Sequence, residues 1–221
     1  MSGYFHHERH EIGPLLPKNA SNILEIGAAS GQTLRWIKTI YPNAQTTGVE
    51  INHAVAGELS RNVDVAIIGG IDECLPRLER YDLILMLDVL EHLVDSASVL
   101  QSVRALLQPG GHVVVSVPNL AHLSVAVPLL FRRQFDYQDA GILDRTHVRF
   151  FVESTAVGLM NAASLNVSKG LISGMQGYRA RALNCFSLGL LRHHLAKQYI
   201  MLGEPIEGDV QQQPVKWINA D

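Results

Sequence analysis

Residues 22–34 constrain the fold more than any other stretch of the chain. Residues 23–26 form an apolar run that predicts a short strand buried on both faces. Gly27 and Gly31 then enclose a tight turn. Behind it apolar residues recur at helical spacing, namely Leu34, Ile37 and Tyr41. A strand, a glycine turn and a helix in this order bring backbone N–H groups close to a ligand, so the stretch predicts the entrance of a nucleotide site.

The turn matches neither of the two best-known glycine motifs. It lacks the terminal Gly-Lys-Ser/Thr of a phosphate loop, and Ala29 stands where a dinucleotide fingerprint has a middle glycine. Glu25, just before the turn, is unusual at the end of a buried strand. Its carboxylate needs a partner, either backbone amides of the turn or a positive group of a ligand.

A second carboxylate belongs to the same prediction. Glu50 ends the next expected strand, residues 44–51, about twenty residues past the glycine turn. In nucleotide-binding βαβ units an acidic side chain at this spacing accepts hydrogen bonds from ribose hydroxyls. The alternative is a strand-end glutamate that faces solvent.

Size and composition bound the class of protein. At 221 residues we expect a single domain over residues 1–204 and a C-terminal tail over 205–221, in which Trp217 docks on the body. A formal net charge of −3 disfavours a broad nucleic-acid surface. The two cysteines form no C-x-x-C pair, and the polar N-terminus does not resemble a secretion signal, so we expect a cytoplasmic protein.

Strands and helices alternate along most of the chain. Further strands are predicted at residues 63–68, 81–87, 112–117, 165–172 and 198–202, and helices at 53–60, from 96 and at 153–163. A stripe of residues on another helix is expected to lie in the core: Leu183, Phe186, Leu190, Leu191 and His194. The alternation predicts an α/β protein with a doubly wound, largely parallel sheet.

Polar side chains gather where this sheet is expected to bind ligands. Asp88, Glu91 and His92 directly follow the strand 81–87, which is the most continuous apolar strand and is expected to be central. Residues 118–151 interrupt the alternation and predict a lid over the carboxyl edge of the sheet. The lid is dense in polar groups, including Asp144 and His147, which indicates recognition of a second molecule.

The sequence favours neither a metal site nor a membrane-binding surface. His6, His7 and His10 cluster in an entry helix expected within residues 4–16, and His6 and His10 share a face, but a solvated helix is the better interpretation. We therefore predict no metal site. Arg132 and Arg133 follow an apolar stretch, yet two charges on a short helix are weak support for membrane contact, which we do not expect.

Four motifs in register resemble the class I S-adenosylmethionine-dependent methyltransferases. They are residues 24–31, 48–50, 81–92 and 107–111. Residues 116–119 and 141–151 are similar to a bacterial subset found in polysaccharide or secondary-metabolite loci and related to the ubiquinone-pathway O-methyltransferases. The resemblance covers about residues 4–203. It implies a Rossmann-like sheet of seven strands whose last strand is antiparallel, with the lid inserted after the fifth strand.

The resemblance also implies roles for individual residues. S-adenosylmethionine is the cofactor, and S-adenosylhomocysteine is the product that remains. The implied cofactor-binding residues are Arg9, Glu25, Gly27, Ala28, Ala29, Gly31, Glu50, Ile51, Gly70, Ile71, Asp72, Leu87 and Asp88. Glu50 holds the ribose, Ile51 and Ile71 flank the adenine, and Gly27, Leu87, Asp88 and Arg9 receive the methionine end.

Two residues depart from the family pattern. Ala29 replaces the middle glycine, which is tolerable if its φ stays negative. Gly70 stands where an acidic residue contacts the adenine amine, so Asp72 or a backbone carbonyl takes that role.

The predicted reaction is methyl transfer to a hydroxyl or amine of a small molecule, and a sugar or glycan precursor is favoured by the resemblance alone. A hydroxyl acceptor needs a base, for which His92 and His147 are the candidates, with Asp144 orienting His147. Packing is the alternative role for both histidines. The rival functions are a nicotinamide-dependent Rossmann oxidoreductase and a non-catalytic adaptor built on the methyltransferase fold.

Overall fold

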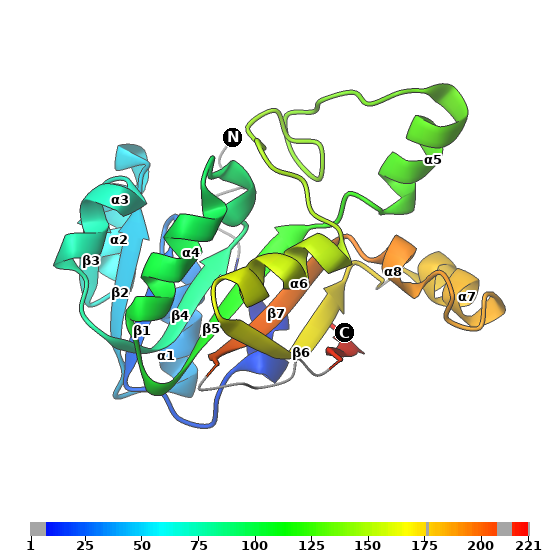
Figure 1. Cartoon of the computed structure of the whole chain (residues 1–221). Coiled ribbons are helices and arrows are strands. Elements are labelled where there is room, and N and C mark those ends of the chain that lie inside the picture. The colour runs from blue at the N-terminus through cyan, green and yellow to red at the C-terminus, as the bar shows by residue number, and fades with distance from the viewer. Residues whose placement is uncertain (1–7, 176, 207–213, 221) are drawn as a thin grey trace.

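The computed structural model describes residues 8–175, 177–206 and 214–220, and within them one mixed sheet forms the body (Figure 1). Its eight strands lie in the order β3-β2-β1-β4-β5-β7-β6-β8. The strands are β1 (Asn22–Ile26), β2 (Gln45–Glu50), β3 (Val65–Ile68), β4 (Tyr81–Leu87), β5 (Leu107–Pro118), β6 (Leu165–Ser173), β7 (Gln198–Pro205) and β8 (Lys216–Asn219).

Helices cover both faces of the sheet. The α-helices are α1 (Gln32–Ile40), α2 (Ala56–Asn62), α3 (Ile71–Cys74), α4 (Ser96–Ala105), α5 (Leu123–Arg132), α6 (Glu153–Ala162), α7 (Tyr178–Phe186) and α8 (Arg192–Leu195). The 3-10 helices are η2 (His10–Leu15), η3 (His53–Val55), η4 (Leu75–Arg77) and η5 (Leu90–His92). One hydrophobic core lies under α3, α4 and α6, and the other under η2, α1 and α2.

Strand β4 illustrates how the sequence produces these two cores. Leu83, Leu85 and Leu87 face the core with α1, whereas Ile84 and Met86 face the core with α4. Because successive side chains of a strand point to opposite faces, a continuous apolar run is stable only where both faces are covered. The sequence-based placement of this strand at the centre of the sheet is therefore confirmed.

The strand directions confirm the predicted fold class. β1 pairs in parallel with β2 and β4, β2 with β3, and β4 with β5, while β7 runs antiparallel between β5 and β6. The strand count differs from seven, because β8 in the expected tail pairs in parallel with β6. β7 begins at the edge where β4 and β5 end, and this brings Gln198 to the carboxyl edge.

Two sequence-based element boundaries were wrong. β5 begins at Leu107 rather than at His112, because Leu107 already pairs with Tyr81, and a register shift before the next pair, Leu83 with His112, accommodates the Pro-Gly-Gly stretch. The expected core helix is divided into α7 and α8 by a turn with Gly189 at φ +83°, and Phe186 on it is 88% exposed.

The lid is joined to the body by a narrow base. Asn119 forms a bridge with Phe151, and the Leu120 N–H donates to the Phe151 carbonyl at 2.8 Å. The buried Asn119 amide also donates to the carbonyls of His193 and Ala196, both at 2.8 Å. The insertion therefore leaves and re-enters the sheet at one point, and Figure 1 shows α5 standing off the body.

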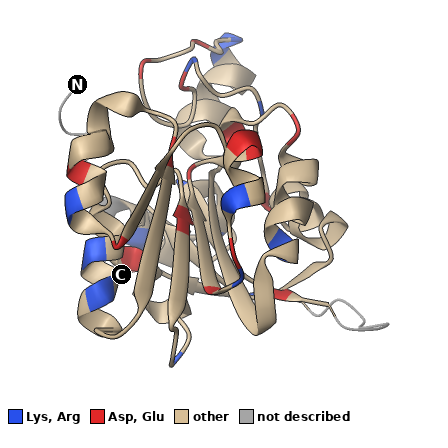
Figure 2. Cartoon of the chain, turned by 90° about the vertical axis from the view of Figure 1, so that its left-hand side faces the viewer, with Lys and Arg blue, Asp and Glu red and all other residues tan. Residues whose placement is uncertain are grey.

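Figure 2 marks charged residues of both signs, and they are interspersed over the helices and loops, in keeping with the net charge of −3. Among the described residues, no helix combines the length and the apolar content needed to cross a bilayer.

The contact between β8 and β6 provides a test of the fold. A Cβ at Gly170 would lie 2.3 Å from Trp217 Cζ3, so the indole covers this glycine. We expect Gly170→Ala to lower the free energy of unfolding by about 1–3 kcal/mol through overpacking, and to shift Trp217 emission to the red. Urea denaturation followed by fluorescence measures both.

Gly158→Ala is the matched control, because it lies in α6 with no atom within 4 Å of a built Cβ. It should raise the free energy of unfolding by up to about 1 kcal/mol, the difference in helix propensity. Equal stability of the two variants would contradict the docking of Trp217 on β6.

Candidate functional site

The glycine turn after β1 is held against β2 by its own backbone. The N–H groups of Gly27 and Ala28 both donate to the Val49 carbonyl, at 2.8 and 3.0 Å. Gly27 and Gly31 have φ of +76° and +78°. A Cβ at Gly27 would lie 2.6 Å from Val89 Cγ2, so this glycine is required by its protein neighbour as well as by its φ.

Ala29 does not have the negative φ at which its methyl group would be tolerable in the turn. Its φ is +46°, in the left-handed region, where a residue with a Cβ is strained by about 1–2 kcal/mol. The conformation lets its N–H donate to Glu50 Oε2 at 2.8 Å. The strain at Ala29 therefore accompanies a direct link between the turn and the neighbouring strand.

Glu50 is buried at the end of β2 and faces the turn. Its Oε2 accepts from the Ala29 N–H, and its Oε1 accepts from the Asn52 N–H at 2.8 Å. A carboxylate offers about four lone-pair positions, so these two bonds leave capacity for hydroxyl donors. Ile51, the next residue, is 71% exposed and lies at the rim of the site.

Glu25 lies deeper, at the end of β1, with no hydrogen-bond partner for Oε2. Burial, reinforced by the charge of Glu50 and opposed by that of Arg9, raises the pKa of Glu25 to about 8. From the sequence we expect this carboxyl to need a partner. The described residues supply none for Oε2, which is itself buried.

The segment that follows β3 leaves open space at the carboxyl edge of the sheet. A Cβ built on Gly70 meets no atom within 4 Å. Ile71 is half-buried, and Asp72 is exposed in the first turn of α3. The edge next to Glu50 therefore has room in front of Gly70.

A hydrogen-bonded network occupies the centre of the carboxyl edge. Asp88 follows the buried Leu87 with φ +56°, and Arg9 Nη1 donates to its Oδ2 at 2.7 Å. Gln198 Nε2 and Ser116 Oγ also donate to Asp88, at 2.8 and 2.7 Å. Arg9 further contacts Glu11, Ser116 and Gln198, so most of its N–H groups are already paired.

Sequence reasoning missed Ser116 and Gln198. Ser116 is a polar residue near the carboxyl end of the apolar part of β5, a signal like that of Glu25 and Glu50, whereas Gln198 is the first residue of β7. Gln198 could not be placed at this edge before the antiparallel direction of β7 was known.

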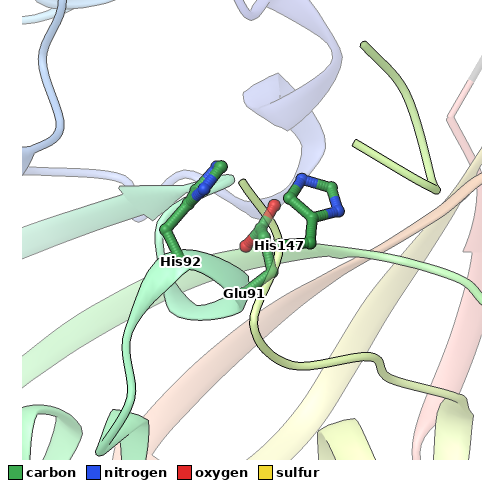
Figure 3. Close-up of side chains that lie close together, drawn as sticks. All are labelled: Glu91, His92 and His147. Carbon is green, nitrogen blue, oxygen red and sulfur yellow. The ribbon is translucent and has the colours of Figure 1, made fainter. Parts of the chain in front are cut away.

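Glu91, His92 and His147 lie together beside this network (Figure 3). The first two belong to η5 and the third to the lid. The Glu91 carbonyl accepts from the N–H groups of Val148 and Arg149, at 2.9 and 3.1 Å. These bonds bring residues 55 positions apart to one place, with the His92 and His147 ring centroids 4.8 Å apart.

Backbone carbonyls orient both imidazoles. His147 Nδ1 donates to the Ile142 carbonyl at 3.0 Å, and His92 Nδ1 donates to the Thr146 carbonyl at 3.3 Å. In the neutral form of either ring, Nε2 is then the nitrogen without a proton. Burial, helped by His92, holds the pKa of His147 below its ordinary value.

Asp144 does not hold the His147 ring. Its Oδ1 accepts from the N–H and hydroxyl of Thr146, at 2.8 and 2.6 Å, and the nearby Ile142 carbonyl holds the imidazole instead. Asp144 shapes the loop on which His147 stands.

The carboxyl group of Glu91 is isolated from hydrogen-bond donors. It is 1% exposed, and neither carboxyl oxygen has a hydrogen-bond partner. Burial and the charge of Asp88 raise the pKa of Glu91 well above its ordinary value.

The N-terminal histidines are only partly described. His6 and His7 lie outside the described residues, and His10 Nε2 contacts Glu8 Oε2 at 2.7 Å. The expected entry helix is a 3-10 helix at His10–Leu15, and it carries Arg9 to the sheet edge.

A hollow of about 790 Å³ lies at the opposite end of the sheet, where β5 begins. It is open to solvent and lined by Arg80, Arg104 and Gly111, among others. Open α/β sheets bind ligands at the carboxyl ends of their strands, and the orphaned carboxyls Glu25 and Glu91 lie near that edge. We therefore take the carboxyl edge as the functional site.

Comparisons with known proteins converge on one family. A family model described as a methyltransferase domain matches residues 1–169. The methyltransferase str2 of Strobilurus tenacellus is 31% identical over 105 residues, covering 48% of this chain and 38% of that protein. The ubiquinone biosynthesis O-methyltransferase of Bradyrhizobium sp. (strain ORS 278) is 34% identical over 89 residues, covering 40% of this chain and 34% of the relative. The matched region thus spans little more than a third of these curated relatives.

A solved structure shares the fold. A SAM-dependent methyltransferase from Archaeoglobus fulgidus superposes with a TM-score of 0.65 at 16% identity, covering 88% of this chain and 90% of that one. At this identity the likeness concerns the fold alone.

The buried carboxyl of Glu25 makes stability depend on pH. The folded protein keeps the Glu25 proton up to about pH 8, whereas the unfolded chain releases it near 4.5. The free energy of unfolding therefore falls as pH rises through this window, by about 1.4 kcal/mol for each unit of pKa difference. Glu25→Gln removes this dependence, so urea denaturation should find it more stable than wild type at about pH 8.5 and close to wild type below about pH 5.

Glu79→Gln replaces an exposed residue at the other end of the sheet and serves as the control. It should leave the pH dependence of the free energy of unfolding intact. If Glu25→Gln altered stability equally at both pH values, Glu25 would not be the buried neutral acid described above.

Proposed function

We infer the function from one premise, that the chain belongs to the methyltransferase-domain family. On this basis we propose that it transfers a methyl group from S-adenosylmethionine to a hydroxyl or amine of a small molecule. The observation that carries the proposal is the placement of Glu50, a buried carboxylate joined to the glycine turn and facing the carboxyl edge of the sheet.

The residues at this edge fit the cofactor. Glu50 retains acceptor positions for two vicinal hydroxyls, and Gly70 has open space in front of it beside Ile71. The orphaned Oε2 of Glu25 lacks only a donor, which the ammonium group of the methionine end offers. Arg9 forms an ion pair with Asp88 next to it, so the Arg9 guanidinium can meet the carboxylate of that end by exchanging a protein contact.

The chain's contribution to the reaction is orientation and proton removal. S-adenosylmethionine supplies a methyl group that is already activated on a sulfonium sulfur. Holding two reactants in line saves up to about 7–11 kcal/mol of the barrier, so binding geometry does most of the work. A hydroxyl acceptor gives its proton to a base as the methyl carbon–oxygen bond forms, and Nε2 of His147 or His92 is available as that base.

The aromatic side chains of the lid favour an acceptor that contains a ring. Phe135, Tyr137 and Phe150 form an aromatic cluster with edge-to-face contacts, and Phe150 also contacts the His147 ring. Aromatic faces pack on flat or weakly polar rings. We propose a sugar or glycan precursor as the acceptor, with a phenolic ring as the competing class.

The rival functions predict different cofactors or partners. A nicotinamide-dependent oxidoreductase gains thermal stability with NAD and none with S-adenosylhomocysteine. A non-catalytic adaptor binds S-adenosylhomocysteine and a stoichiometric protein partner but turns over no acceptor.

Calorimetry with S-adenosylhomocysteine tests the cofactor site. We expect Glu50→Ala to weaken binding by at least about tenfold, because a hydrogen bond to a charged group contributes about 1.5–3 kcal/mol. Glu50→Gln keeps an acceptor oxygen and should weaken binding less. Glu79→Ala, at the opposite edge, is the control. Full affinity in a folded Glu50→Ala protein would refute the assignment.

Acceptor turnover tests the histidines. Release of S-adenosylhomocysteine is measured on a panel of sugar nucleotides, free sugars and phenols. We expect His147→Ala to lower kcat by about 100-fold or more, the usual contribution of a positioned base, with cofactor affinity retained. His194→Ala is the matched control, since its Nδ1 also contacts a carbonyl, that of Ala121 at 3.1 Å, outside the site. Turnover of His147→Ala at the wild-type rate would remove His147 from the chemistry.

A further inference from the structure

We propose that Glu91, His92 and His147 form a binding site for one divalent cation of the zinc type. One potential ligand atom from each side chain lies within 4.8 Å of the other two (Figure 3). The sequence predicted no metal site, because its clustered histidines His6, His7 and His10 are better interpreted as part of a solvated helix. His147 stands far from Glu91 and His92 along the chain.

The buried Glu91 side chain is the observation that points to a cation. It is 1% exposed, both of its oxygens lack a hydrogen-bond donor among the described residues, and it faces the two imidazoles. Burial of a polar group without a partner costs free energy, and buried carboxylates are normally paired with a cation or bound to a metal. A divalent cation between the three side chains supplies the missing partner.

The two histidines are oriented as metal ligands are. Each donates its Nδ1 proton to a backbone carbonyl, His147 to Ile142 and His92 to Thr146. In metal sites the second ring nitrogen commonly makes this type of bond, which fixes the ring and leaves the other nitrogen for the metal. Here both Nε2 atoms remain as ligands.

The spacing is compatible with closure of the site. A tetrahedral site with bonds of about 2.1 Å holds its ligand atoms about 3.4 Å apart. The present separations, up to 4.8 Å, therefore need side-chain shifts on the scale of rotamer adjustments. The bonds from Val148 and Arg149 to the Glu91 carbonyl keep the lid and η5 in register while the side chains move.

Two other acidic groups nearby are already engaged. Asp88 accepts from Arg9, Gln198 and Ser116, and Asp144 accepts from Thr146. The protein ligand set is therefore two imidazoles and one carboxylate, which suits zinc or cobalt and leaves a position for an outside ligand. Magnesium prefers a shell of oxygen ligands and is disfavoured.

The open position gives the site a chemical role, and this part alone rests on the proposed function. A hydroxyl of the acceptor that binds there has its pKa lowered by the metal, so its oxygen is deprotonated before it forms the bond to the methyl carbon. With the metal bound, the two imidazoles are its ligands and no longer act as the base proposed above, and the hydroxyl proton passes to solvent.

The test uses the full chain stripped of metal with a chelator and dialysed. Zn²⁺ and Co²⁺ are titrated by calorimetry, with visible absorption of Co²⁺ as a second readout of its coordination. We expect one cation per chain and no competition from Mg²⁺. Glu91→Gln and His147→Ala should each lower the affinity by at least about tenfold, the loss that even an outer-shell change causes.

Two controls locate the cation. His10→Ala leaves the affinity unchanged if the cation sits at the lid, and a loss there would move the site to the N-terminal histidines and overturn the proposal. His194→Ala should also bind like wild type. If Glu91→Gln fails to fold, His92→Ala gives the same information. Absence of binding by the wild-type chain, or unchanged affinity in the folded ligand variants, refutes the site.

Titration of the same stripped protein with S-adenosylhomocysteine separates this inference from the proposed function. Retained cofactor binding without metal binding refutes the metal site alone. Metal binding without cofactor binding refutes the proposed function and leaves the metal site standing.

Discussion

Buried carboxyl groups at or near the ends of neighbouring strands impose the main physical constraint on this protein. Glu50 meets it with two backbone amides, whereas Glu25 retains an oxygen without a partner at the end of β1, and Glu91 retains two just beyond β4. Each unpaired buried oxygen lowers stability. We propose that a ligand supplies the donors that Glu25 and Glu91 lack, which would concentrate binding energy at this edge of the sheet.

The rest of the architecture serves that edge. The two apolar cores hold β1, β2 and β4 in register, so that their final residues lie side by side. The antiparallel β7 adds Gln198 from the opposite chain direction, and the 3-10 helix η2 carries Arg9 to Asp88. The lid leaves and returns through Asn119 and Phe151, and it lays His147 over η5. The site is thus assembled from strand ends, one N-terminal segment and one insertion.

Strain and polarity coincide at this edge. Ala29 and Asp88 both have positive φ, and both lie in the turns that follow strands. At Ala29 the backbone N–H is aimed at Glu50, and Asp88 receives three side-chain donors. Such conformations persist where surrounding contacts determine them, and they cluster at ligand sites. They support the proposal that this edge was shaped for binding and not for stability alone.

The sequence by itself determined the alternation of strands and helices, the central position of residues 81–87 and the glycine turn with its two carboxylates. These features follow from local periodicity and from short spacings, which a linear chain displays directly. Only the tertiary structure decided that His147 meets Glu91, that Ile142 holds its ring in place of Asp144, that β8 joins the sheet and that Phe186 is exposed. Each of these depends on contacts between distant segments or on a single turn such as that at Gly189, and neither leaves a periodic pattern in the sequence.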